Sequence, residues 1–121
     1  HGKNSGEEFA RSFSNTFNSY QSSLGFYVTD KLYHGAHGLS LKLKGIEPGI
    51  NHEAEPRGIV IHGADYVSES FIKQYGRLGR SQGCPAVSSD LCEPIVTSIK
   101  GGSCFFMFYP DQTYFETSEL I

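Results

Sequence analysis

Alternating and continuous apolar runs predict strands along most of the chain. Residues 39–44 (LSLKLK) alternate with a period of two, which indicates a strand with one face toward water. Residues 25–29 (GFYVT) are aromatic and β-branched, and residues 58–62 (GIVIH) are typical of a buried strand that ends in a polar residue. Residues 104–109 (CFFMFY) are apolar on both faces, so they are expected to form a central strand that Pro110 stops.

Two segments have helical patterns. Residues 68–75 begin with a serine that can cap a helix and a glutamate that suits its first turn. Residues 89–100 repeat apolar residues every four positions and are followed by two glycines. Pro94 fits this second helix only if the regular part begins near Glu93.

The remaining segments read as loops. Residues 1–23 are rich in serine and asparagine, so they are expected to form a covering loop with at most one helical turn, although three phenylalanines are spaced by four. Residues 45–57 hold proline, glycine and asparagine and form a long loop. Many strands and few helices predict a mainly β fold, with mixed β sheets or a sandwich and one or two packed helices.

Size and charge narrow the class of protein. The chain has 121 residues, which fits one domain with its own core, and 38% apolar residues, which excludes a disordered chain. A net charge of −3 argues against a nucleic-acid partner. The longest apolar run, residues 104–109, is far shorter than the roughly 20 residues of a membrane helix, so no transmembrane segment is expected.

Residues 79–87 (GRSQGCPAV) carry the most informative pattern. Gly83 permits a positive φ or a close approach of the backbone to a ligand, and Pro85 fixes the chain after Cys84. Such a turn holds the thiol outward and aims the amides of Gly83 and Cys84 at one point, where they can stabilise an oxyanion. The alternative is that Cys84 is a small buried hydrophobic residue.

A thiol with a pKa of about 8.5 is mostly protonated at neutral pH, so a nucleophilic Cys84 needs a base. His62 is the best candidate, because it closes the strand at residues 58–62 and precedes Gly63. Together Cys84 and His62 would give a Cys–His nucleophile. The alternative is a structural histidine whose hydrogen bonds are satisfied.

The other histidines and cysteines form no familiar site. His34 and His37 are a conceivable metal pair, but with the cysteines they match no compact zinc spacing, so no metal is expected. Cys92 and Cys104 are expected to be core thiols, and the sequence leaves open whether they pair.

Three basic or aromatic residues stand shortly before Cys84 in the sequence. Tyr75, Arg77 and Arg80 form a basic, aromatic approach to Cys84. They either bind a carboxylate or only solvate a loop.

Residues 59–68 (IVIHGADYVS) and 76–87 (GRLGRSQGCPAV) resemble the L,D-transpeptidase catalytic domain (YkuD-like), most closely the murein branch with a GCPAV active-site loop. Similarity extends to residues 22–29 (SSLGFYVT), 37–41 (HGLSL) and 99–104 (IKGGSC), so it covers most of the chain. The resemblance implies that family's mixed β fold with a few helices.

The resemblance also implies a reaction on peptidoglycan stem peptides in the bacterial cell envelope, periplasmic or secreted. Cys84 would attack the carbonyl at the L-centre of meso-diaminopimelate and expel the terminal D-alanine. An amine of a second stem would then resolve the thioester to a 3→3 cross-link, and water would instead give L,D-carboxypeptidase activity. No cofactor is implied.

By position, the family pattern assigns roles to further residues. His62 would be the base and then the acid, oriented by the Gly63 carbonyl, and the amides of Gly83 and Cys84 would hold the oxyanion. Ser81 matches the family's Ser/Thr, whereas Gln82 stands where this branch tends to have Trp and the broader family His. The expected substrate contacts are Ser81, Gln82, Arg80 and His37.

Family members normally carry further strands before the segment that begins this chain. Residues 1–121 are therefore expected to be an N-terminally incomplete catalytic domain with an exposed sheet edge, open to homodimerisation. The rival interpretations are a carboxypeptidase or papain-style cysteine peptidase, a non-catalytic peptidoglycan-binding module and a metal-binding module.

Overall fold

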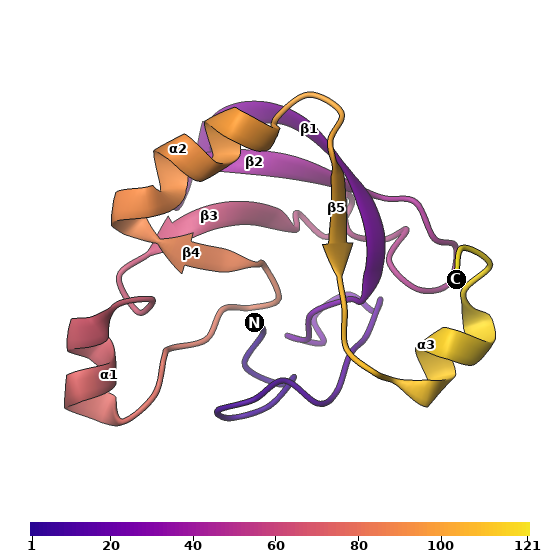
Figure 1. Cartoon of the computed structure of the whole chain (residues 1–121), viewed down its shortest axis with the longest axis horizontal. Helices are drawn as coiled ribbons and strands as arrows, with labels where there is room; N and C mark the ends of the chain where they lie inside the picture. Colours follow the sequence, from indigo (N-terminus) through magenta and orange to yellow (C-terminus); the bar gives the residue numbers. More distant parts are fainter.

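The computed structural model describes all 121 residues and has one five-stranded mixed sheet in the order β4-β3-β2-β1-β5 (Figure 1). Strands β3 and β4 are parallel, and the other neighbours are antiparallel. This mainly β architecture confirms the predicted fold class. The strands are β1 Gly25–Gly35, β2 Gly38–Gly45, β3 Val60–Ala64, β4 Ala86–Ser88 and β5 Cys104–Met107; the helices are α1 Glu69–Tyr75, α2 Ser89–Ile99 and α3 Gln112–Thr117.

Helix α2 covers one face of the sheet and closes the core. Its buried residues Cys92 and Val96 pack with Leu41 of β2 and Ile61 of β3. Because side chains alternate along a strand, a core position for Ile61 sends His62 to the opposite face. The core therefore fixes which face of the sheet carries the candidate base. The buried core consists of Tyr27, Leu41, Leu43, Ala54, Ile59, Ile61, Cys92 and Val96.

The N-terminal segment covers the other face without regular structure. Residues 1–24 contain neither helix nor strand, which confirms the predicted loop, and the helical turn is absent. In Figure 1 this indigo segment lies beneath the sheet. Buried serines fold the segment back on itself: the Gly2 amide donates to Ser22 Oγ at 3.0 Å, and the Ser22 amide donates to Ser5 Oγ at 2.9 Å.

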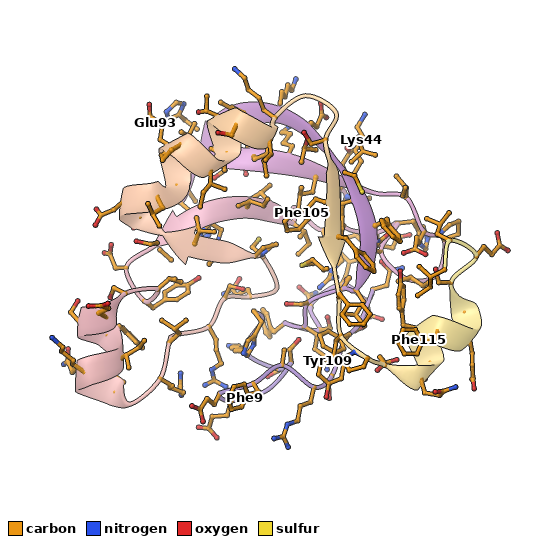
Figure 2. All side chains as sticks on the ribbon, viewed as in Figure 1. Phe9, Lys44, Glu93, Phe105, Tyr109 and Phe115 are labelled. Atoms are coloured by element: carbon orange, nitrogen blue, oxygen red, sulfur yellow. The ribbon has the colours of Figure 1, made fainter.

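Strand β5 lies at an edge of the sheet, so the expected central position is wrong. Its apolar faces are covered differently: Phe105 packs inward against the core, and Phe106 stacks on Phe26 with ring centroids 4.0 Å apart. Figure 2 shows Phe105 on the inner side, whereas Lys44 and Glu93 point outward. Cys104 is exposed on this edge, so its assignment as a core thiol is also wrong, whereas the buried Cys92 confirms its own.

Three strands differ from the predicted bounds, and one of them, β5, ends at Met107 rather than continuing to residue 109 before Pro110. Strand β1 has eleven residues and continues past residue 29 through an irregularity between Thr29 and Leu32, where polar residues interrupt the apolar pattern. Strand β3 begins at Val60 and ends at Ala64, because its parallel pairing with β4 continues to Ala64 opposite Ser88. His62 is therefore the middle residue of its strand rather than the last.

The predicted helices are present, with one difference. Ser68 caps α1 by accepting a hydrogen bond from the Phe71 amide. Helix α2 begins at Ser89, so the expectation that Pro94 delays its start to Glu93 is wrong. The proline removes only the hydrogen bond to the Asp90 carbonyl, and Asp90 is exposed to water. None of the helices combines the length and hydropathy of a membrane crossing.

The third helix was not expected from the sequence. Asp111 caps α3 by accepting from the Tyr114 amide at 2.9 Å, and Tyr114 is the buried residue of this helix. The sheet ends at β4 on one side and β5 on the other. Dimerisation through a sheet edge stays a prediction.

Candidate active site

A cavity of about 550 Å³ lies between the N-terminal segment and the sheet face opposite α2. It brings the two candidate catalytic side chains together, with His62 from β3 and Cys84 from the loop before β4. The β1–β2 hairpin contributes His37, and the cysteine loop contributes Arg80 to Gln82. The complete lining is Lys3, Phe17, Asn18, Tyr20, Tyr33, Ala36, His37, Arg57, Gly58, Ile59, Val60, His62, Tyr66, Arg80, Ser81, Gln82 and Cys84.

Ser81 and Gly83 fix the shape of the cysteine loop. Ser81 Oγ accepts a hydrogen bond from the Gly83 amide at 3.0 Å and donates one to the Cys84 carbonyl at 2.7 Å. Gly83 has a φ of +130°, and a Cβ there would lie 3.0 Å from the Gln21 carbonyl oxygen. The positive φ and the close approach both require glycine.

The thiol of Cys84 is half-buried and is held by the strand beside it. Sγ accepts from the Val60 amide at 3.4 Å and donates to the Gly58 carbonyl at 3.7 Å, and it makes no hydrogen bond to His62. Burial raises the pKa of Cys84, while the Val60 amide and the Arg57 guanidinium lower it in part. Cys84 therefore rests as a neutral thiol at neutral pH.

The imidazole of His62 is oriented by its own backbone. Nδ1 lies 2.9 Å from the Gly63 carbonyl oxygen, which can only accept, so Nδ1 carries the proton and Nε2 is left as a base. The His62 amide donates to the Pro85 carbonyl at 3.3 Å, and His62 pairs with Ala86. The parallel pairing of β3 and β4 thus places His62 beside the residues that follow Cys84.

His37 stacks on the His62 ring. Their centroids are 4.2 Å apart and the rings are 13° from parallel. Burial lowers the pKa of His62, the hydrogen bond to Gly63 opposes this by favouring the charged ring, and His37 lowers the pKa further. His34 does not line the cavity, and the chain holds no group of three or more His, Cys, Asp or Glu in a metal-binding arrangement.

The amides expected to form the oxyanion hole differ in availability. The Gly83 amide already donates to Ser81 Oγ, whereas the Cys84 amide has no acceptor within the protein. Gln82 is exposed, lines the cavity and forms no side-chain hydrogen bond. The donors free to meet a ligand near Sγ are therefore the Cys84 amide and the Gln82 side chain.

Of the three residues expected to form a basic, aromatic surface leading to Cys84, one is found at the cavity. Arg80 lines the cavity, with Nη1 donating to the Lys3 carbonyl at 3.0 Å. Tyr75 packs on Phe71, and Arg77 donates to the Leu78 carbonyl. Neither Tyr75 nor Arg77 lines the cavity.

Arg57 is the main site residue that the sequence patterns did not indicate. Its guanidinium donates four hydrogen bonds at 2.9 to 3.2 Å, to Ser14 O, Ser19 Oγ, Gln21 O and Ser23 Oγ. It therefore fastens the N-terminal segment to the cavity and places a positive charge near the thiol. The available signal was an arginine directly before a buried strand, at the end of a long loop.

Comparison with known proteins gives one match. The family model of the L,D-transpeptidase catalytic domain matches residues 1–108, a range that includes every residue lining the cavity. Searches among curated proteins and among solved structures give no match.

Proposed function

Because this chain belongs to the L,D-transpeptidase catalytic domain family, we propose that it is a cysteine acyltransferase acting on peptidoglycan stem peptides. Residues 1–121 act as one catalytic domain in the bacterial cell envelope, without a cofactor. The observation that carries this proposal is that one cavity contains the Cys84 thiol and the His62 imidazole, whose Nε2 is free of other partners.

The first step forms a thioester. Sγ of Cys84 rotates away from the Gly58 carbonyl and attacks the carbonyl carbon at the L-centre of meso-diaminopimelate, while its proton passes to Nε2 of His62. The oxyanion then collapses, the bond to D-alanine breaks, and imidazolium returns the proton to the leaving amine. The Gly63 carbonyl favours the protonated ring and keeps it oriented between the two transfers.

The oxyanion is assigned to the Cys84 amide, with the Gln82 side chain as a second donor. The Gly83 amide contributes indirectly, because its hydrogen bond to Ser81 Oγ fixes the loop that orients the Cys84 amide. Ser81 is therefore proposed as a residue that positions the loop, rather than as a direct substrate contact.

The second step breaks the thioester. An amine of a second stem attacks the acyl carbon, His62 accepts the amine proton, and Cys84 leaves as a thiol after reprotonation. The product is a 3→3 cross-link. Water at the same position gives a trimmed stem and L,D-carboxypeptidase activity.

The test of the nucleophile is intact-mass measurement after exposure to a carbapenem. We expect one covalent adduct on the wild-type chain and on Cys92→Ser and Cys104→Ser, and none on Cys84→Ser, because only Cys84 lines the cavity. An adduct retained by Cys84→Ser would remove this residue from the mechanism. Analysis of muropeptide products then separates dimers from trimmed monomers, and binding of stems without any adduct would favour a non-catalytic module.

A further inference from the structure

The cavity is lined by five basic residues and by no aspartate or glutamate. A concave surface with one sign of charge concentrates ligands of the opposite sign. The lysine and the two arginines of the lining therefore favour an anionic ligand, although the whole chain has a net charge of −3. The five basic residues are Lys3, His37, Arg57, His62 and Arg80.

Three of these five residues are engaged within the protein. Both terminal nitrogens of Arg57 donate to the N-terminal segment. His62 is bound to the Gly63 carbonyl, and His37 stacks on its ring. The cations left with free donors are Lys3 and Arg80.

Backbone contacts bring Lys3 and Arg80 to the same part of the cavity. The Lys3 amide donates to the Ser81 carbonyl at 2.8 Å, and the Ser81 amide donates to the His1 carbonyl at 2.9 Å. The Lys3 ammonium lies 4.4 Å from the centroid of the Tyr20 ring. Arg80 uses Nη1 for the carbonyls of Lys3 and Gly6, which leaves Nε and Nη2 unpartnered.

Neither cation has a carboxylate partner in the protein, since the ion pairs of the chain are Lys44–Asp30 and His52–Glu53. We propose that Lys3 and Arg80 form a carboxylate subsite that binds the C-terminal carboxylate of the departing residue. The identity of that residue, D-alanine, rests on the proposed function. An ammonium and a planar guanidinium both suit a carboxylate, because both donate charge-assisted hydrogen bonds.

The position of the subsite gives it a role in specificity. Arg80 lies four residues before Cys84, in the loop that presents the thiol. In a donor stem, the attacked carbonyl and the terminal carboxylate are separated by one residue, roughly 3.8 Å of chain. Such a subsite in the same cavity as the thiol would select bonds one residue from a free chain end and would disfavour amidated or extended ends.

The test measures binding without chemistry. Cys84→Ala protein is titrated by calorimetry with the tetrapeptide L-Ala-γ-D-Glu-meso-diaminopimelate-D-Ala and with its C-terminal amide. We expect the acid to bind about tenfold more tightly than the amide, a preference that weakens with added salt. Lys3→Gln and Arg80→Gln in the same background should each reduce the preference, whereas Lys73→Gln, on exposed α1 outside the cavity, should keep it.

Equal binding of acid and amide, or no binding of either, would overturn the subsite. An unchanged preference in Lys3→Gln would also overturn the subsite. The Lys3 ammonium contacts the Tyr20 ring, and its loss leaves the backbone pairing of residue 3 with Ser81 intact. The proposed acyl transfer is judged separately, by carbapenem adduct formation on wild-type protein. An adduct together with equal binding contradicts the subsite alone, whereas a missing adduct contradicts the acyl transfer.

Discussion

The pKa of His62 is shifted in opposite directions by its surroundings. Burial and the stacked His37 ring disfavour the charged imidazole, and the Gly63 carbonyl favours it. Burial lowers the pKa of His62, and burial also raises the pKa of Cys84. The resting pair is therefore a neutral thiol and a neutral imidazole, so in the proposed reaction His62 would act as a general base during attack rather than as one half of a preformed ion pair.

Replacing His37 with alanine should raise the pKa of His62, because the ring becomes more hydrated and loses a repelling neighbour. A general base works only when neutral, so the acid limb of the acylation profile should move to higher pH. The variant should then lose activity near pH 6 and keep nearly full activity near pH 8. The measurements are the pH dependence of carbapenem acylation and an NMR titration of His62.

His34→Ala is the matched control, since His34 lies on the same hairpin but does not line the cavity. Its acid limb should coincide with that of wild type. An unchanged or lowered His62 pKa in His37→Ala would contradict the electrostatic role assigned to the stack.

Residue patterns indicated which two side chains share the cavity, but not the contacts that hold them there. The sequence around Cys84 and His62 indicated both side chains, and both line one cavity. The occupied amide of Gly83 and the fastening role of Arg57 were not predictable, because each depends on how a loop folds. The Arg57 partners lie 34 to 43 residues away in the sequence, at a distance that no local pattern encodes.

At the scale of elements, α2 approaches β3 closely at Gly63. A Cβ at this position would lie 3.1 Å from Cys92 Cβ and 3.1 Å from Ser89 Cα. Gly63 therefore allows the start of α2 to rest on the strand that carries the candidate base. The same residue supplies the carbonyl that orients His62.

Gly63→Ala should destabilise the fold by about 1–3 kcal/mol, because the added methyl group pushes α2 from the sheet. Urea denaturation measures the change in the free energy of unfolding. Thr97→Ala, on the exposed side of α2, should change stability by less than about 0.5 kcal/mol. Wild-type stability in Gly63→Ala would show that α2 can shift without cost.

Local patterns identified most elements, with β4 and α3 as exceptions, but they did not give the placement of the strands in the sheet. Strand β2 and helix α2 were recognisable from a period of two and a repeat of four. Strand β5 lies at the edge of the sheet because it pairs with β1, some eighty residues earlier in the chain. The apolar residues on both faces of β5 do not indicate whether the strand is central or at an edge. The extension of β1 beyond Thr29 was hidden because polar residues interrupt the apolar pattern there.

At the scale of the whole molecule, Glu47 connects distant parts of the chain. Its buried carboxyl group accepts from the Phe26 amide at 2.9 Å, from the Tyr114 hydroxyl at 2.8 Å and from Ser118 Oγ. Helix α3 lies outside the range matched by the family, yet it docks on the sheet through this group. The C-terminal helix is thus part of the folded unit.

Tyr114→Phe should lower the free energy of unfolding by about 1–2 kcal/mol, because Glu47 stays buried and loses a donor. Tyr75→Phe is the control, since the Tyr75 side chain is exposed and its hydroxyl has no partner. Chemical denaturation of both variants checks the difference. Equal stability of the two would mean that water replaces the lost hydroxyl and that Glu47 does not hold α3.

The irregular N-terminal segment, residues 1–24, has a consequence for how the lining of the cavity can vary. Strand β3 and the loop before β4 supply His62 and Cys84, whereas the N-terminal segment has no strand pairing to preserve beyond a single bridge between Gly2 and Ser81. Exchanging side chains along it would alter the lining of the cavity while the hydrogen-bond ladder of the sheet stays intact. Differences in cavity lining among members of this family should therefore collect in the N-terminal segment.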